Sequence, residues 1–411
     1  MKIIILSHGH PKLQKGGGEI AAYAWYELLL ALGHEVVFVG WGGQLKADQS
    51  KTIMREVGKD DYLIYTTTDF FHFSSMNDTL LTSLEVLVQA YQPDVVHLHH
   101  YIHLGIEAAA VIKRLAPRAR VVLTLHEYLA ICHNNGQLLT TSGVICKGYA
   151  PEHCHKCFPL ISANEFFMRE LTIKAAFANI DHFIAPSQFL FDRYVNWGIS
   201  VDRISAIENP FACSSELVKP SKLAPVSGEP WRVGFFGQIN YYKGVDVIVD
   251  GVRLAAKAGL QIELGIHGKI STVTGEKYSE NLLDAIRDSS DFVTFYGSYD
   301  KTDVQHLMSQ YHFVIMGSRW FENSPVVIQE ALEANRPLIV PGIGGMLEKV
   351  KGIGLTYLPS NPVSLQELLQ SLDHCLYATL AARVEQHRSK LDEQRLDHRE
   401  SVLALYDRSL T

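Results

Sequence analysis

Short apolar stretches alternate with longer helical stretches along most of the chain, and this alternation is the main indication of fold class. The apolar stretches predict buried strands at 2–7, 35–40, 94–98, 120–125, 182–185, 231–236, 261–267, 292–296, 312–316 and 337–341. Helical periodicity fills the intervals, as at 19–32, 78–91, 106–115 and 244–258. Because strands without polar alternation are buried on both faces, the pattern predicts parallel sheets covered by helices, an α/β protein.

The alternation stops once, between residues 214 and 230, and this break suggests a domain boundary. The stretch is polar, contains three prolines and lacks periodicity, as expected of a connection between domains. The strand–helix pattern restarts at Trp231, whereas 364–410 is mainly helical in character. At 411 residues the chain is also longer than one hydrophobic core usually supports. We therefore expect two Rossmann-like, doubly wound domains.

Charge and apolar content limit the expected partners and location. The formal net charge is −7, so no overall basic field attracts nucleic acid, and no nucleic acid partner is expected. No apolar stretch approaches the roughly 20 residues of a spanning helix, and the opening stretch 3–6 is too short for a secretory signal. A cytoplasmic protein is expected. Residues 164–178 are either a helix packed in the first domain or a surface helix at the inner face of a membrane.

The strongest chemical motif runs from Ser318 to Ala331, after one predicted strand and into a predicted helix. Asn323 or Ser324 suits the N-cap of that helix, and Pro325 suits its first position. A helix start offers unpaired N–H groups and a positive dipole end, which suit a phosphate. Glu330 lies five residues after Pro325, about 7.5 Å along the axis, where a carboxylate reaches sugar hydroxyls near that phosphate. Glu322 precedes the cap. The alternative is that both glutamates are ordinary helix carboxylates.

Two more loops of the second half could approach a ligand. Gly237 follows a predicted strand, which lets the backbone come close to a bound group, and Lys243 stands beside the next helix start as a charge for a diphosphate. Gly344 and Gly345 follow another strand. Three such turns at one sheet edge predict a ligand crevice, because open α/β sheets bind ligands at the carboxyl ends of their strands.

The first half offers weaker signals of the same kind. Three glycines, Gly16–Gly18, follow the first strand but lack the G-x-G-x-x-G spacing of dinucleotide-binding proteins. His126 ends a predicted strand at the carboxyl edge of the sheet, where a histidine is as plausibly functional as structural. His97, His99 and His100 end another strand and are weaker candidates for chemistry.

Together these residues resemble the family-4 retaining glycosyltransferases of the GT-B fold, over nearly the whole chain. The most specific segment is Glu322 to Glu330, which matches the family's E-x7-E motif. Other matching positions are Gly16–Gly18, Thr124–His126, Asn209, Gly237, Lys243–Gly244, Pro337–Gly345 and Glu348. The resemblance implies two Rossmann-like domains facing a central cleft. Residues 1–212 would form the acceptor-side domain and 213–385 the nucleotide-sugar domain, and a helix in 386–411 would cross back to the first domain.

The resemblance also assigns roles to individual residues. The catalytic group would be His126, Glu322 and Lys243, with His126 reaching the transferring sugar, Glu322 binding the donor sugar and Lys243 contacting its diphosphate. The remaining donor-binding residues would be Gly17, Gly18, Gly237, Gln238, Asn323, Ser324, Pro325, Val326 and Glu330. Of these, Glu330 would bind the ribose hydroxyls, and Gly17 and Gly18 would close over the phosphate.

The chain departs from the family pattern at the position after Gly237. The family usually has arginine there, whereas this chain has Gln238, which supplies no positive charge. Lys243 and the helix start at Ser324 must then stabilise more of the phosphate charge. Glu127, where many relatives have aspartate, is a milder change.

The expected reaction is transfer of a hexose, with retention, from a nucleotide sugar to a hydroxyl acceptor. UDP-glucose is the first-choice donor, and the acceptor is a carbohydrate or a lipid-linked glycan in polysaccharide or glycolipid synthesis. No strand-end D-x-D is evident, so no catalytic metal cofactor is expected. A same-face, ion-pair-like substitution is favoured over a carboxylate nucleophile, because no equivalent carboxylate is evident in the first half.

Two other functions remain open at this stage. A non-hydrolysing UDP-N-acetylglucosamine 2-epimerase shares the two-domain fold and would act on the donor alone. A nucleotide-sugar-binding protein without transferase activity is kept open by Gln238. A dinucleotide oxidoreductase is less favoured, because neither half has the full glycine fingerprint.

Four of the six cysteines, Cys132, Cys146, Cys154 and Cys157, form an insertion near 132–157. In a reducing compartment their spacing suits a structural zinc held by four thiolates, and free or partly oxidised thiols are the alternative.

Overall fold

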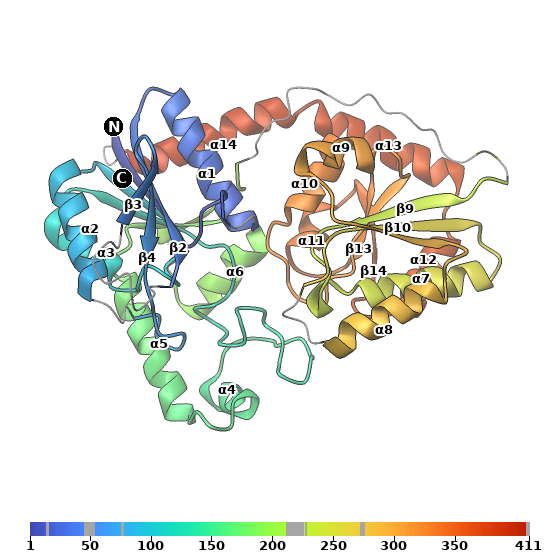
Figure 1. The fold of residues 1–411 in the computed structure, drawn as a ribbon, viewed down its shortest axis with the longest axis horizontal. Helices are drawn as coiled ribbons and strands as arrows, with labels where there is room; N and C mark the ends of the chain where they lie inside the picture. Colours follow the sequence, from blue (N-terminus) through green and yellow to red (C-terminus); the bar gives the residue numbers. More distant parts are fainter. Residues whose placement is uncertain are drawn as a thin grey trace. The chain divides into compact units, whose positions relative to one another are not determined.

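The protein is described from a computed structural model that covers residues 1–13, 16–44, 54–74, 78–210, 226, 228–271 and 276–407. The chain divides into two compact units (Figure 1). The first contains Met1–Ala212 and Arg395–Thr411, and the second contains Cys213–Gln394. The return to the first unit starts at Arg395, later than residue 386 expected from the sequence. Most of the connection expected at 214–230 lies outside the described residues.

The described part of the first unit forms an eight-stranded sheet with helices in the intervals. Its elements are β1 (Lys2–Ser7), α1 (Gly17–Ala31), β2 (Glu35–Gly43), β3 (Met54–Gly58), β4 (Asp61–Tyr65), α2 (Asp78–Tyr91), β5 (Val95–His99), α3 (Ala108–Leu115), β6 (Arg120–Thr124), α4 (Pro151–Cys157), α5 (Ala163–Phe177), β7 (His182–Ala185), α6 (Gln188–Trp197), η1 (Val201–Arg203), β8 (Ile204–Ala206) and the end of α14 (Leu391–Tyr406).

The described part of the second unit has a six-stranded sheet, covered by helices on both faces (Figure 1). Its elements are β9 (Trp231–Phe236), η2 (Tyr241–Lys243), α7 (Val245–Lys257), β10 (Ile262–His267), α8 (Glu276–Arg287), β11 (Val293–Gly297), η4 (Lys301–Asp303), α9 (Val304–Met308), β12 (Phe313–Ile315), α10 (Val326–Glu333), β13 (Leu338–Pro341), α11 (Gly344–Lys349), β14 (Gly354–Tyr357), α12 (Pro362–Gln370) and α13 (His374–Arg388).

Both sheets are doubly wound, as predicted. The strand orders are β3-β4-β2-β1-β5-β6-β7-β8 and β11-β10-β9-β12-β13-β14. All neighbours are parallel except β3 and β4, which pair antiparallel at the edge of the first sheet. The winding direction reverses between β1 and β5 in the first sheet, and between β9 and β12 in the second. Ligands of open α/β sheets bind beside the carboxyl ends of the strands at such points.

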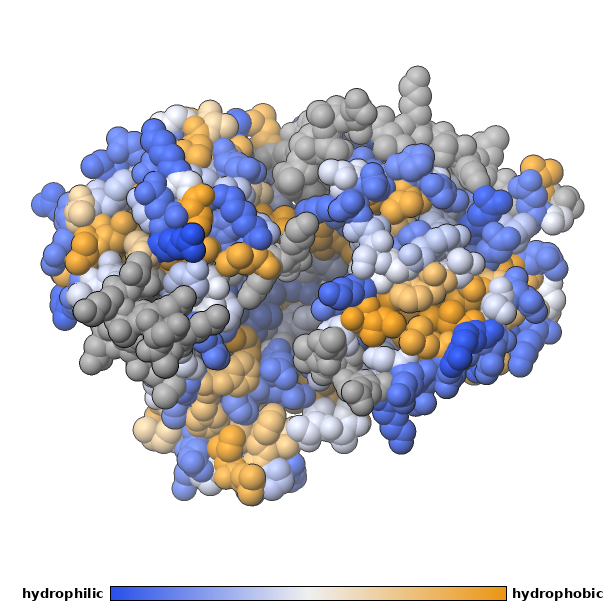
Figure 2. Space-filling view, in the orientation of Figure 1, coloured by the Kyte–Doolittle hydropathy of each residue, from blue (hydrophilic) through white to orange (hydrophobic). Residues whose placement is uncertain are grey.

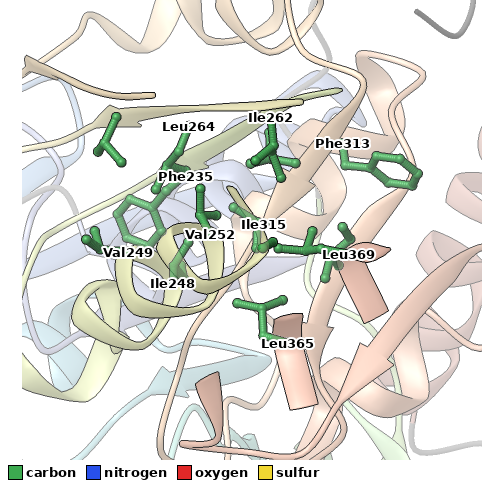
Figure 3. Close-up of a cluster of buried hydrophobic side chains, with 14 of the residues drawn as sticks. Phe235, Ile248, Val249, Val252, Ile262, Leu264, Phe313, Ile315, Leu365 and Leu369 are labelled. Atoms are coloured by element: carbon green, nitrogen blue, oxygen red, sulfur yellow. The ribbon is translucent and has the colours of Figure 1, made fainter. Parts of the chain in front are cut away.

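The apolar runs of the sequence correspond to strands that are buried on both faces. In β9, Phe235 belongs to the core on one face of the second sheet, whereas Phe236 belongs to the core on the other. Successive side chains of a strand point to opposite faces, so a strand between two helix layers must be apolar throughout. Figure 3 shows the first of these cores, where β9, β10 and β12 pack against α7 and α12.

The last helix, α14, completes the core of the first unit. Val402 and Tyr406 are buried there with Ile3, Ile5 and Val95 of the central strands. The hydroxyl of Tyr406 lies 2.6 Å from Nδ1 of the buried His97. The sheet at the start of the chain is therefore packed against a helix made from its end.

Candidate active site

The reversal point of the second sheet brings a lysine and a glutamate together. Lys243 ends η2 after β9, and Glu322 lies in the loop after β12. Lys243 Nζ lies 2.5 Å from Glu322 Oε1, and Ser318 Oγ donates to the same oxygen at 2.7 Å. Glu322 is only 6% exposed. A buried carboxylate needs such partners, because desolvation of an unpaired charge is costly.

Glycine allows the two loops that carry this pair to touch. Gly244 has a φ of +58°, and a Cβ there would lie 2.0 Å from the carbonyl oxygen of Gly317. A Cβ on Gly317 would in turn lie 2.4 Å from the carbonyl oxygen of Gly244. The loops after β9 and β12 therefore meet backbone to backbone, which sets the reach of Lys243 toward Glu322.

The helix expected after Glu322 begins one residue later than predicted. Pro325 is the N-cap of α10, with φ −69° and ψ 123°, and Val326 is the first helical residue. The predictions of Asn323 or Ser324 as cap and Pro325 as first helical residue were wrong, because Pro325 takes an extended ψ. No side chain caps this helix start, so the N–H groups of its first turn face the loop without a side-chain acceptor.

The glycine pair after β13 supports the loop from the other side. Gly344 and Gly345 open α11, and the Gly345 N–H donates to the Glu322 carbonyl at 2.8 Å. A Cβ on Gly345 would lie 1.6 Å from the carbonyl oxygen of Asn323. The loop before α10 thus rests directly on the start of α11. The third predicted turn is brought to the same place as the first two.

Glu330 occupies the second turn of α10 and is half-buried. Burial raises its pKa, the nearby Lys301 lowers it and Glu333 raises it. Glu330 also interacts electrostatically with Tyr299, whose pKa is raised mainly by burial. Tyr299 lies edge-on to Phe236, with ring centroids 5.7 Å apart. An aromatic surface, a carboxylate and a lysine therefore gather beyond the end of β11.

Gly237 and Gln238 leave open space at the end of β9. Gly237 has a φ of +133°, and a Cβ built on it would meet nothing within 4 Å. Gln238 is exposed. Arg319, in the loop after β12, donates to Asp246 at 2.8 Å and lies over the Tyr241 ring at 4.5 Å. Its guanidinium is therefore held by α7, and it does not supply a free charge beside Gln238.

In the first unit, the predicted glycine loop is the first turn of α1. Gly16 is the N-cap, and Gly17 and Gly18 are helical. A Cβ on Gly18 would lie 2.8 Å from His8 Cε1 and 3.4 Å from His126 Cγ. His126 is half-buried. The loop was predicted to precede the helix, but Gly17 and Gly18 belong to its first turn, and Gly18 leaves no room for a Cβ against the two histidines.

His8 joins α1 to the strand ends of the first sheet. Its Nδ1 donates to the His99 carbonyl at 3.1 Å, and its Nε2 lies 3.4 Å from Glu19 Oε1 in the first turn of α1. Sequence reasoning missed His8 and Glu19. The available signal was the position of His8 directly after β1, at the reversal point of the sheet.

The neighbouring strand ends add a second histidine–carboxylate contact. His100 Nδ1 accepts the N–H groups of Tyr101 at 2.9 Å and Ile102 at 3.0 Å, so its proton is on Nε2. That nitrogen lies 2.9 Å from Glu127 Oε1. Burial raises the pKa of Glu127 to about 8, and burial also lowers the pKa of His100 well below its usual value.

The four clustered cysteines line one cavity of about 680 Å³ in the first unit. Burial raises the pKa of Cys154 to about 11 and also raises that of Cys132. Across the described ranges, no three His, Cys, Asp or Glu side chains are placed to hold a metal ion together. Zinc requires sulfur atoms about 2.3 Å from one point, so these thiols would have to move toward one another. A structural zinc therefore stays a prediction.

Most predicted site residues of the second unit fall in one neighbourhood. The structure brings together Lys243, Glu322, Asn323 and the start of α10, with Gly344 and Gly345 beneath them. It places His126, Gly17 and Gly18 at the strand ends of the first unit. Cys132, Cys146, Cys154 and Cys157 lie in a separate cavity.

Two family models match successive parts of the chain. Residues 15–214 match the family model Glycosyltransferase Family 4, and residues 230–374 match Glycosyl transferases group 1. No curated protein matches the chain by sequence.

Solved structures match over nearly the whole chain. Anabaena Alr3699/HepE in complex with UDP and glucose is 18% identical, with a TM-score of 0.65, over 98% of this chain and 100% of that one. Sucrose-phosphate synthase from Thermosynechococcus elongatus is 17% identical, with a TM-score of 0.67, over 99% of each chain. A glycosyltransferase from Rickettsia africae is 16% identical, with a TM-score of 0.67, over 99% of each chain.

These structures share the GT-B fold, with two parallel-sheet α/β domains, and the same fold describes this chain. The chain thus has the GT-B fold, with a match to the Glycosyltransferase Family 4 model in its first half followed by a match to the Glycosyl transferases group 1 model in its second.

Proposed function

We propose that the protein is a retaining, metal-independent glycosyltransferase that moves a hexose from a UDP-sugar, with UDP-glucose as the first-choice donor, to a hydroxyl acceptor. The observation that supports it most is the ion pair of Lys243 and Glu322 beside the uncapped start of α10, at the reversal point of the sheet. A lysine and the positive end of a helix suit a diphosphate, and a fixed carboxylate suits sugar hydroxyls. The similar HepE structures hold UDP and UDP-glucose, which favours this donor class.

In the proposed reaction, the bond between sugar C1 and the diphosphate oxygen breaks while a bond from C1 to the acceptor oxygen forms on the same face. The acceptor hydroxyl gives its proton to the leaving diphosphate, which carries away the electron pair. Negative charge grows on the diphosphate, so fixed positive groups accelerate the step. Lys243 has three N–H donors, of which Glu322 engages one, and the others can reach a phosphate.

The remaining roles follow from position. Glu330, in the second turn of α10, binds the ribose hydroxyls, and its partial burial strengthens such hydrogen bonds. Asn323, Ser324, Pro325 and Val326 lie at the phosphate and donor sugar. Gly237 and Gln238 offer the open backbone at the end of β9. His126, Gly17 and Gly18 are the proposed contacts from the first unit.

We also propose that the acceptor is a carbohydrate or a lipid-linked glycan, in polysaccharide or glycolipid synthesis. The protein would act at the inner face of the cytoplasmic membrane. No helix in the described ranges is long and apolar enough to cross a bilayer. In α5, one face is buried through Phe166 and Ile173, whereas Phe167, Met168 and Leu171 are exposed. Figure 2 shows apolar residues at the end of the first unit where Figure 1 places α4 and α5. This exposed face suits contact with a lipid surface.

The test is turnover of radiolabelled UDP-sugars by wild-type protein and by Lys243→Ala and Glu330→Ala. Wild type should transfer hexose from one UDP-sugar to a polysaccharide or glycolipid acceptor, and product linkage should be α when the donor is α. Both variants should lose at least about 100-fold in turnover. Conversion of the donor alone would indicate an epimerase, and UDP binding without turnover would indicate a binding protein. Wild-type turnover in both variants would refute the assignment of Lys243 and Glu330 to the active site.

A further inference from the structure

Two histidines from adjacent strands of the first unit touch through their ring nitrogens. His99 ends β5, and His126 follows the end of β6. His99 Nδ1 lies 3.2 Å from His126 Nε2. The ring planes are 25° apart, with centroids separated by 5.5 Å. His99 is fully buried, whereas His126 is half-buried.

One N–H hydrogen lies between the two ring nitrogens in this contact. Burial lowers the pKa of both His99 and His126 well below the usual value, and neighbouring histidines lower each further. Both rings are therefore neutral near pH 7, with one N–H and one lone pair each. A nitrogen–nitrogen hydrogen bond needs one donor and one acceptor, so only one ring supplies the N–H.

The second nitrogen of His99 decides the direction. His99 Nε2 is buried and has no hydrogen-bond partner among the described residues. If the proton were there, an N–H group would be buried without an acceptor, and such orphaned donors are rare. With the proton on Nδ1, His99 donates to His126 Nε2 and leaves only a lone pair unpaired. The proton of His126 is then on Nδ1.

The neighbour His100 shows that backbone partners select tautomers at this sheet edge. Two backbone N–H groups donate to its Nδ1, which leaves its proton on Nε2. No backbone N–H among the residues that the structure describes donates to the ring of His99 or His126, so each ring relies on the other. Gly18 packs against the Cγ–Cδ2 edge of His126, and no protein group in the described ranges bonds its Nδ1 atom. That nitrogen is the one available to a ligand.

We propose that His99 is a positioning residue that fixes the Nδ1–H tautomer of His126, so that His126 presents a hydrogen-bond donor to the transferring sugar. That the ligand of His126 is a sugar follows from the proposed function, on which this part of the proposal rests. The proposal implies that His126 binds a sugar oxygen and does not accept the proton of the acceptor hydroxyl. That division agrees with the leaving diphosphate as the proton acceptor.

The test begins with nitrogen NMR of histidine side chains in the full-length protein, which distinguishes the two tautomers. His126→Gln assigns the signals of His126. Wild type should show a protonated Nδ1 and an unprotonated Nε2 at His126. In His99→Leu the donor is lost, and His126 should change to the Nε2–H form that free imidazole side chains favour. His99→Asn keeps an N–H donor at the δ position, on a nitrogen bonded to Cγ, and should restore the wild-type signals.

Turnover gives an independent reading. The value of kcat/KM for the UDP-sugar should fall about tenfold in His99→Leu, the worth of one hydrogen bond, and recover in His99→Asn. His182→Gln, a buried strand histidine bonded to Ser205, serves as the matched control and should keep wild-type turnover. An Nε2–H signal for His126 in wild type would overturn the proposal, as would an unchanged signal in His99→Leu. Because the NMR reading needs no substrate, it stands or falls separately from the transferase assignment.

Discussion

Lys243 Nζ lies 2.5 Å from Glu322 Oε1, although 79 positions separate the two residues in the chain. The contact joins the two loops at the reversal point of the second sheet. In the proposed reaction the lysine must serve two anions, the buried carboxylate and the diphosphate. Their competition makes the pair a sensitive probe of the site.

Glu322→Gln should separate binding from turnover. The change removes the carboxylate charge but keeps a side chain of the same shape, so Lys243 is free to hold UDP. UDP affinity should stay the same or rise, whereas kcat falls about 100-fold because the donor sugar loses its acceptor group. Calorimetry with UDP and initial rates check both values. Lys257→Ala, at the exposed end of α7, is the control, and parallel losses of affinity and rate in Glu322→Gln would contradict the competition.

Gly345→Ala should disturb the loop before α10. A Cβ at Gly345 would lie 1.6 Å from the Asn323 carbonyl oxygen, so the loop must move. We expect a loss of about 1–3 kcal/mol in the free energy of unfolding, typical of overpacking, and weaker UDP binding. Gly342→Ala is the matched control, because its Cβ would meet its nearest neighbour at an ordinary 3.5 Å. Equal behaviour of the two variants in chemical denaturation would refute the packing argument.

Glu127 should make stability depend on pH. Burial raises its pKa from 4.5 to about 8, so between these values the folded protein holds a proton that the unfolded chain releases. Rising pH therefore favours unfolding over this range. Glu127→Gln removes the effect, and the stability of the variant relative to wild type should increase from pH 5 to pH 8 and then level off. Urea denaturation at several pH values measures the difference, and a constant difference would mean that the carboxyl is ionised throughout.

A structural zinc at the cysteine cavity predicts one equivalent of metal in freshly purified protein. Cys154→Ser should then lose the metal, whereas Cys375→Ser, at an exposed position outside the cluster, should keep it. Elemental analysis under reducing conditions provides the measurement. Metal-free wild-type protein would leave four free thiols around the cavity as the correct description.

Replacing the exposed apolar face of α5 should weaken membrane binding. Phe167, Met168 and Leu171 are 49%, 54% and 44% exposed, so serine at all three positions should change folding stability little. Sedimentation with phosphatidylglycerol–phosphatidylethanolamine vesicles should show at least about tenfold weaker binding, because each side chain loses apolar contact with lipid. Val86→Ser removes another exposed apolar residue, from α2, as a control. Unaltered sedimentation of the triple variant would show that this face of α5 does not bind the membrane.

The sequence predicted the central strands well because both of their faces are buried. Lys2–Ser7 and Trp231–Phe236 agree residue for residue with the structure. The edge hairpin of β3 and β4 was not predicted, because Arg55 and Glu56 are exposed and give β3 no apolar run. A strand buried on both faces is a continuous apolar run in the sequence, whereas an exposed edge strand lacks such a run.

The site was predictable as a set of loops but not as a set of contacts. Glycine and lysine positions after strands identified the correct turns. The ion pair of Lys243 and Glu322 depends on β9 and β12 being neighbours, and single-sequence patterns do not give strand order. His8 and His99 were missed or ranked low for the same reason, since their partners come from other strands.

The contact of Tyr406 with His97 has a consequence for biosynthesis. The core of the first unit combines Ile3 and Ile5 with Val402 and Tyr406, which are synthesised much later. Domains made first usually fold first during translation. Here the core of the first unit stays incomplete until α14 has been synthesised, because Val402 and Tyr406 belong to it. The first unit can therefore complete its core only after the second unit, Cys213–Gln394, has been synthesised.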